Sequence, residues 1–239
     1  MSAGAPLVLA QDGFFRDRTG ADSCVADNGF CPDWIVDNFD RYVDPFFEHI
    51  YLTVVPVAIG FVIALSLGMV AHRQRWLVGP LTGLTSALYT VPSIALFLLL
   101  LPITGRGNTT AIVALTAYTL VIIFRNVVTG LGNVPRDAID AAIGMGMTSR
   151  QRLLRVEIPL ALPEILAGVR IAAATTVGLA ALAYLAGAGG LGQQIDAQIT
   201  FKSNVIVAGG LVTLLAAGLD FIVLAVQRLL TPWRRAVLA

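Results

Sequence analysis

The sequence predicts an all-α membrane protein with about five transmembrane helices. Its composition points that way, because 56% of the 239 residues are hydrophobic and 13% are charged, a balance rare in water-soluble domains. Five separate apolar segments are each long enough to cross a bilayer as a helix, which takes about 20 residues. Strands are excluded at that depth, since an open sheet edge would leave backbone groups unpaired in lipid.

The chain divides into an acidic N-terminal segment, residues 1–45, and a membrane domain, residues 46–239. Residues 1–48 hold nine of the fifteen acidic residues and three of the sixteen basic ones. We expect no signal peptide, because the first apolar run is short and no basic residue precedes it. For the two cysteines, Cys24 and Cys31, a small disulfide loop and two unpaired thiols both remain open. No metal site is expected, since no histidine stands near them.

An amphipathic stretch, residues 34–47, is expected to lie along the membrane surface before the first span. The five predicted spans are residues 50–71, 77–101, 110–131, 162–186 and 205–226. Nine arginines then fall on one side of the membrane: Arg73, Arg75, Arg136, Arg150, Arg152, Arg155, Arg228, Arg234 and Arg235. Because positive charge accumulates on the cytoplasmic side, the N-terminus is predicted to lie outside and the C-terminus inside.

The second predicted span is interrupted by Pro92, which removes a backbone donor and clashes with the preceding turn. The interruption indicates either a structural kink or a contribution to the translocation path, for which Tyr89, Pro92 and Ser93 are the candidates. The fourth predicted span is rich in glycine, alanine and threonine, a composition that allows close helix contact in lipid.

The loop between the third and fourth spans, residues 132–161, carries the signals of two short helices. Pro135 suits the first turn of one helix, and Gly146 can end it. Thr148 and Gln151 then fit a capping box that starts the second. We expect Pro159 to break that second helix before the fourth span begins.

Residues 140–163 of this loop resemble the EAA loop of ABC-importer permeases. The family pattern is an acid, two alanines, three residues, a glycine, nine residues and Ile-x-Leu-Pro; Asp140, Val156 and Ile158 replace its Glu, Ile and Leu at intact spacing. The resemblance implies that the loop docks onto a cytoplasmic ATPase. It assigns this coupling role to Asp140, Ala141, Ala142, Gly146, Thr148, Arg150, Ile158 and Pro159.

Four further motifs resemble the permease branch that serves glycine betaine, carnitine and choline: TVPSIALF (90–97), FRNVVTGL (124–131), PLALPEILAGVRIA (159–172) and LAGAGGLG (185–192). Methionine-type permeases share a similar glycine-rich loop after the fourth span, so methionine or another small amino acid stays open as the cargo. The resemblance implies a type I ABC-importer fold in a bacterial inner membrane. It also implies partner ATPases that hold ATP and Mg, an extracytoplasmic binding protein, and a second permease, either the same or a paralogous chain.

The glycine-rich loop contains Gly187, Gly189, Gly190 and Gly192 and satisfies the G-x-G-x-x-G dinucleotide pattern. It follows a membrane helix rather than a strand, and no βαβ unit surrounds it, so phosphate binding is not expected. We interpret it instead as a tight turn at the outer mouth, where backbone can approach a solute or a partner.

Asp220 is an acid inside the fifth predicted span, and such residues are usually paired or functional. It precedes Arg228 by eight residues, or about 12 Å of helix. Arg170 lies at a similar depth on the fourth span and is the first candidate partner; Arg125 is the second. A water-filled inner vestibule around Asp220 is the alternative.

Other function classes find no support in the sequence. It has no P-loop, no His-Glu-x-x-His and no Gly-x-Ser-x-Gly, so neither a fused ATPase nor a protease is expected and the chain is predicted not to be an enzyme. Nucleic-acid binding is not expected, because the basic residues lie at the ends of apolar runs rather than on one face. A secondary transporter or channel that works alone remains the rival reading, although no internal repeat is evident.

Overall fold

The computed structural model describes residues 21–233, and every regular element in that range is a helix. Four helices form the long framework: α3 (Val43–Arg73), α6 (Asn108–Gly132), α9 (Ile158–Ala180) and α11 (Lys202–Leu230). All four belong to stretches long and apolar enough to cross a membrane, and the bent pair α4 (Val78–Thr90) and α5 (Ser93–Thr104) supplies a fifth span if it is counted as one. The predicted all-α architecture with about five spans is confirmed.

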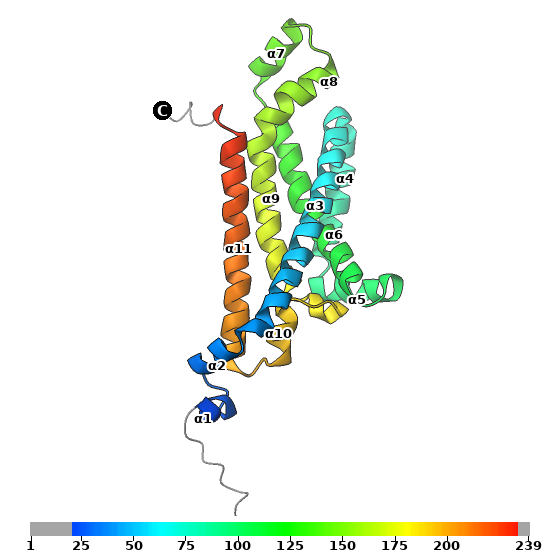
Figure 1. The fold of residues 1–239 in the computed structure, drawn as a ribbon. Helices are drawn as coiled ribbons and strands as arrows, with labels where there is room; N and C mark the ends of the chain where they lie inside the picture. The colour runs from blue at the N-terminus through cyan, green and yellow to red at the C-terminus, as the bar shows by residue number, and fades with distance from the viewer. Residues whose placement is uncertain (1–20, 234–239) are drawn as a thin grey trace, which may run out of the picture.

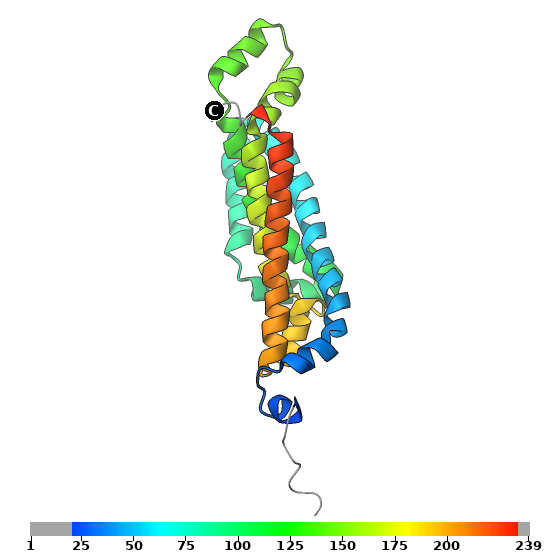
Figure 2. The same cartoon turned by 60° about the vertical axis from the view of Figure 1, so that its left-hand side comes forward.

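The shorter elements gather at the two ends of this framework (Figure 1). They are α1 (Ala21–Ala26), α2 (Pro32–Asp37), η1 (Phe39–Tyr42), η2 (Arg75–Leu77), α7 (Arg136–Gly144), α8 (Ser149–Arg152), η3 (Leu153–Glu157), η4 (Ala183–Ala186) and α10 (Leu191–Ala197). Figures 1 and 2 show α7 and α8 projecting beyond one end of the long helices, while α1, α2 and α10 lie at the other. We refer to these as the loop end and the turn end.

Helix α6 forms the centre of the packing, with α3 and α9 against it and α11 against α9. At the loop half of the bundle its Phe124 and Val127 side chains are inaccessible to solvent. Glycines make the close crossings possible: a Cβ at Gly68 would overlap Val127, and a Cβ at Gly168 would come within 2.5 Å of Asn126. Small residues therefore let the helix backbones approach, which is how helices pack in lipid.

The break predicted at Pro92 is present and is larger than a kink. Helices α4 and α5 meet at an angle of 96°, so α5 lies across the bundle rather than continuing α4 (Figure 1). Val91 adopts an extended backbone with ψ 126°, as the residue before a proline prefers. The Tyr118 hydroxyl donates a hydrogen bond to the Val91 carbonyl, which satisfies a backbone group that the break leaves without a helical partner.

The expected break at Pro159 is wrong. The chain is helical without interruption from Ser149 to Ala180, because a π-helical segment, Leu153–Glu157, comes directly before the proline. A π-turn shifts the hydrogen-bond register by one residue, so the helix can accommodate a proline that lacks a backbone donor. Pro159 is the second residue of α9, two positions after the π-helical segment ends at Glu157. The second loop helix is thus an extension of the fourth span beyond the bundle.

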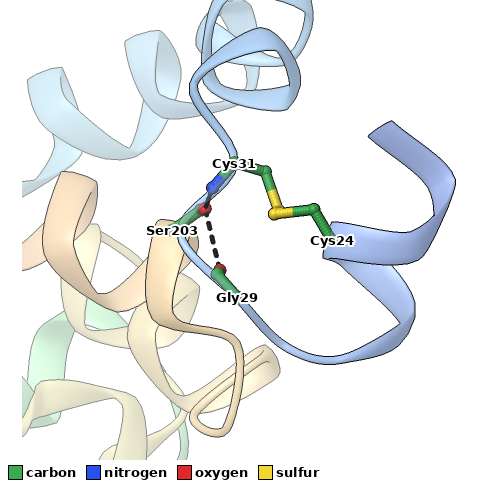
Figure 3. The surroundings of a disulfide bond; sticks show 4 residues. All are labelled: Cys24, Gly29, Cys31 and Ser203. Carbon is green, nitrogen blue, oxygen red and sulfur yellow. Dashed lines mark hydrogen bonds between the residues drawn. A yellow bond between two sulfur atoms is a disulfide. The ribbon is translucent and has the colours of Figure 1, made fainter. Parts of the chain in front are cut away.

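At the turn end, the N-terminal segment is held by a disulfide between Cys24 and Cys31, whose Cα atoms are 5.9 Å apart. Of the two states left open for these cysteines, the structure has the bonded one. The Ser203 hydroxyl, in the first turn of α11, accepts a hydrogen bond from the Cys31 amide at 2.7 Å. The same hydroxyl donates to the Gly29 carbonyl at 3.2 Å (Figure 3). One side chain of α11 therefore holds two residues of the segment between α1 and α2.

The amphipathic stretch 34–47 is not one interfacial helix. It consists of the end of α2, the short η1 and the start of α3, with Asn38 outside helical geometry. Two of its aromatic residues pack inward: the Trp34 ring meets Phe201 edge-on at 4.6 Å, and the buried Tyr42 hydroxyl donates to Asn204 at 2.8 Å. These contacts tie the segment to the first turn of α11, whereas Phe39 and Phe47 are exposed.

The disulfide should matter locally rather than globally. Replacing Cys24 with serine removes the bond between two cysteines that are seven positions apart in the sequence. The lost bond corresponds to about 2–3 kcal/mol of loop-closure entropy. We expect faster amide hydrogen exchange in residues 24–38 and unchanged exchange in α6. Ser203→Ala is the matched variant, since it removes the two hydrogen bonds and keeps the disulfide. Unchanged exchange in 24–38 after both substitutions would show that the clamp does not order this segment.

Candidate functional site

The loop end presents a compact unit built from α7 and α8. Pro135 precedes α7 as its N-cap residue, and the chain reverses at Gly146, whose φ of +76° is a left-handed conformation that favours glycine. The predicted capping box is present: the Thr148 side chain accepts from the Gln151 amide, and the Gln151 side chain accepts from the Thr148 amide at 2.9 Å. Local sequence signals thus fix where both helices of the loop begin.

The two alanines of the loop, Ala141 and Ala142, do not lie on the same face. Ala142 is inaccessible to solvent, whereas Ala141 is exposed. The apolar side chains that do face outward are Ile143 and Met145, 53% and 68% exposed. Ala142 therefore serves packing within the loop, and Ile143 and Met145 form the surface available to a partner. A glutamate at position 142 would disturb the loop itself and is not a clean test of docking.

The remaining loop residues fall into two groups. Asp140 and Arg150 are exposed, so both can meet a partner. Ile158 packs against the buried cluster around α6, and Pro159 lies in the first turn of α9. The residues of the family pattern thus include exposed positions and positions that fix the loop to the bundle.

A buried carboxylate joins the loop to α3, and sequence reasoning missed it. Glu157 is 1% exposed; its Oε2 lies 2.5 Å from Nε2 of His72, and its Oε1 accepts from Nε of Arg152 at 2.6 Å. A buried carboxylate is stable only when it is paired in this way. Three arginines at positions 150, 152 and 155 precede Glu157 in the sequence, but their spacing does not single this acid out. Movement of α8 would therefore be transmitted to the end of α3.

At the turn end, the glycines predicted to form a tight turn do so. Gly187 and Gly190 have φ of +81° and +84°, backbone angles that residues other than glycine rarely adopt. A Cβ at Gly192 would overlap the backbone of Ala181, and one at Gly189 would overlap the Glu48 carboxylate. Each of the four glycines is therefore required either by its backbone conformation or by a close neighbour.

Glu48 holds this turn against α3 and was also missed from sequence. Its Oε2 accepts from the Gly190 amide at 3.0 Å, and its Oε1 accepts from the Asn108 side chain at 3.1 Å. The next residue, His49, is buried and its Nε2 lies 3.1 Å from the Val177 carbonyl. One carboxylate thus links the first turn of α6, the glycine turn and α3, which is the arrangement of a latch between helices.

Replacing Glu48 with alanine should open this latch. Two hydrogen bonds to a charged acceptor are lost, equivalent to about 1.5–3 kcal/mol each where they are desolvated, and less here because Glu48 is half-buried. We expect a cysteine placed at Ala188, a buried residue of the same turn, to react several-fold faster with a water-soluble maleimide in the Glu48→Ala background. Glu48→Gln, which keeps one acceptor oxygen, should show an intermediate rate. Equal rates in all three backgrounds would refute the latch.

Within the span region, the structure brings Asp220 and Arg170 together. Arg170 donates from Nε and from a terminal nitrogen to the two Asp220 oxygens, at 2.8 and 2.7 Å. Arg125, the other candidate, donates to the Ser86 hydroxyl at 2.8 Å instead. The pair joins α9 to α11, and both side chains are about a third exposed. The two hydrogen bonds mean that each charge is compensated mainly by the other.

The residues considered for a translocation path lie at the bend between α4 and α5. The Tyr89 ring meets Tyr118 edge-on with centroids 5.7 Å apart and is 45% exposed. Pro92 is the N-cap of α5 and Ser93 its first residue. At the bend Tyr89 is therefore exposed and Ser93 partly exposed, whereas Tyr118 is buried. Among the described residues, no group of three or more His, Cys, Asp or Glu side chains is arranged to hold a metal ion.

Comparison with known proteins places this geometry among transporters. Residues 57–236 match the family described as binding-protein-dependent transport system inner membrane component. An osmoprotectant import permease, OsmW, of Salmonella typhimurium is 37% identical over 83% of this chain and 96% of its own length. A glycine betaine/carnitine/choline permease, OpuCB, of Bacillus subtilis is 35% identical over 77% of this chain and 86% of its own.

Solved structures of the MetNI methionine ABC transporter in inward-facing conformations resemble the fold. One chain aligns with a TM-score of 0.67 and 28% identity over 77% of this chain and 95% of its own length. A second crystal form gives a TM-score of 0.68 over 81% of this chain. The helical framework described above thus occurs in a known transporter architecture.

Proposed function

We propose that this chain, which belongs to the family of binding-protein-dependent transport system inner membrane components, is the permease through which an ABC importer takes up osmoprotectants. Glycine betaine, carnitine and choline are the favoured cargo. The observation that carries this choice is the set of curated relatives, which are named for those solutes and are 33–37% identical to this chain. Methionine is the second candidate, supported by the 28% identical MetNI structures.

The loop end is the proposed docking site for a separate ATPase that holds ATP and Mg. Ile143 and Met145 are exposed apolar side chains at the tip of an otherwise polar unit, which is typical of an interface core. Movement imposed on α7 and α8 would reach α9 directly, because α8 continues into it. It would reach α3 through Glu157 and His72. ATP-driven closure of two such loops would then switch the bundle between its inward- and outward-facing states.

The proposed orientation places the loop end in the cytoplasm and the N-terminal segment outside. Two observations support it: the arginines of the loop end obey the positive-inside rule, and the Cys24–Cys31 disulfide lies at the opposite end, where an oxidising compartment would preserve it. An extracytoplasmic binding protein would then approach the turn end, next to the latch formed by Glu48 and Gly190.

A second permease, the same chain or a paralogue, would complete the pathway. Helix α11 exposes Leu214, Phe221 and Leu229, whose side chains are 68–76% exposed. Only 11% of the most apolar stretch of this helix is buried within the chain. Such a face can contact either lipid or another subunit. The bend with Tyr89 and Ser93 is the proposed wall of the shared pathway.

The cargo can be identified in liposomes that contain the permease, its ATPase and its binding protein. Uptake of labelled glycine betaine, carnitine, choline and methionine is measured in parallel, with unlabelled solutes as competitors. We expect ATP-driven uptake of at least one quaternary ammonium solute and no competition by methionine. Uptake of methionine alone would overturn the proposed cargo while leaving the importer assignment intact.

A further inference from the structure

A strongly basic cavity lies where the loop joins the membrane helices. It has a volume of about 830 Å³ and is lined by the end of α3, η2, α8 and η3. Arg73, Arg75, Arg150 and Arg152 contribute four guanidinium groups, and Glu157 is the one acid among the lining residues. The charge on that acid is already shared by Arg152 and His72. The cavity therefore carries a large excess of positive charge.

Three of these arginines have no counter-charge in the part of the chain that the structure describes. Within residues 21–233 no ion pair or side-chain hydrogen bond is formed by Arg73, Arg75 or Arg150. All three are exposed, and they come from two segments distant in sequence. Converging, unpaired guanidinium groups are the usual binding site for phosphate, which they bind through paired hydrogen bonds.

An apolar groove continues from this cavity toward the membrane interior. A second cavity of about 330 Å³ shares Arg73, Arg150 and Leu153 with the first and extends along α3 to Ser66. That is seven residues of helix, or about 10 Å. The Ser66 hydroxyl is bonded to the Val62 carbonyl at 2.7 Å, so the groove presents no unsatisfied polar group there.

The groove opens on the outer surface of the helices. Val70 and Leu154 line it and are 47% and 51% exposed. Trp76, directly after Arg75, is 71% exposed, as aromatic side chains are at the membrane–water boundary. The head of the site thus lies at the membrane surface and its tail at the depth of acyl chains.

We propose that this combined site binds an anionic phospholipid, with the phosphate among Arg73, Arg75 and Arg150 and one acyl chain along α3 from Arg73 to Ser66. Charge complementarity selects an anionic head group, since juxtamembrane arginines attract anionic lipids. The groove selects a lipid over a nucleotide or free phosphate, because neither of those ligands has a long aliphatic chain to fill it. The bound lipid bridges α3 and α8 and so stabilises the attachment of the loop to the bundle.

The test uses the purified full-length chain in a neutral detergent, titrated with phosphatidylglycerol and with phosphatidylcholine, with native mass spectrometry as the readout. The variant is Arg73→Gln combined with Arg150→Gln, and the control is Arg155→Gln, an exposed arginine of the same loop outside both cavities. We expect phosphatidylglycerol to bind the double variant roughly thirtyfold more weakly. The control should bind it like the native chain, and phosphatidylcholine should bind weakly throughout. A melting curve for each protein verifies that the exposed substitutions leave it folded.

A third ligand, glycerophosphoglycerol, separates the head group from the acyl chain. It should bind at least tenfold more weakly than phosphatidylglycerol, because it cannot fill the groove. Equal binding of the two would overturn the acyl-chain assignment and leave a simple phosphate site. Equal binding of phosphatidylglycerol and phosphatidylcholine, or no loss in the double variant, would overturn the site altogether.

Discussion

Replacing Asp220 with leucine is expected to reduce the folded permease in the membrane by roughly tenfold, because it leaves a charged guanidinium without a partner inside a membrane helix. In the native chain Arg170 satisfies both Asp220 oxygens at 2.7–2.8 Å and joins α9 to α11. Without the carboxylate, Arg170 has to recruit water or lose its place in the bundle. Immunoblots of membrane fractions measure the amount of permease. The fraction that stays monodisperse after extraction in detergent measures how much of it is folded.

The control is the double variant Asp220→Leu with Arg170→Leu. Removing both charges should restore most of the folded protein, since an ion pair replaced by apolar side chains in an apolar setting is often neutral in stability. The exchange Asp220→Arg with Arg170→Asp should also recover part of it. If the double variant is as depleted as the single one, the leucine at 220 disrupts packing and the ion pair is not the cause.

Replacing Gly146 with valine is expected to lower ATP-driven uptake by at least tenfold while the permease still folds. The glycine has φ of +76°, and a Cβ added there would meet no neighbouring atom within 4 Å, so crowding is not the issue. A β-branched residue in this conformation costs about 1–2 kcal/mol, which is enough to move α7 relative to α8. Uptake and ATP hydrolysis are measured together in the reconstituted transporter.

Gly146→Asn is the matched substitution, because asparagine tolerates the left-handed conformation. It should retain most of the uptake, and hydrolysis in the valine variant should continue without transport. Equal impairment of both variants would show that size or polarity at the tip matters, rather than backbone conformation. Normal uptake by the valine variant would remove the loop tip from the coupling role.

Composition and the length of the apolar runs predicted the helices, because each long apolar run has one way to satisfy its backbone in lipid. The break at Pro92 and the capping box at Thr148 also follow from local chemistry, and the structure has both. Pro159 was misjudged because its local signal is identical whether a helix ends there or a π-turn comes before it. That distinction depends on the packing of Leu153 in the core, which no local pattern reveals.

Among the candidate site residues, too, some could be found from the sequence and others could not. Asp220 could be singled out because a lone acid in an apolar span is conspicuous. Glu48 and Glu157 could not, since each lies at a span end, where charge is ordinary and only the partner distances show a latch. Ala142 matched a family motif, but spacing alone could not say whether its methyl group faces a partner or the interior of the loop.

The central claim is that this chain moves solute only when an ATPase drives its loop end. Uptake into liposomes that contain the permease and its binding protein, with and without the ATPase, at equal permease density and with ATP on the ATPase side, tests it most directly. We expect accumulation against a gradient with the ATPase and ATP, and none when either is withheld. Solute accumulation by the permease without the ATPase would contradict it and indicate a carrier that works alone.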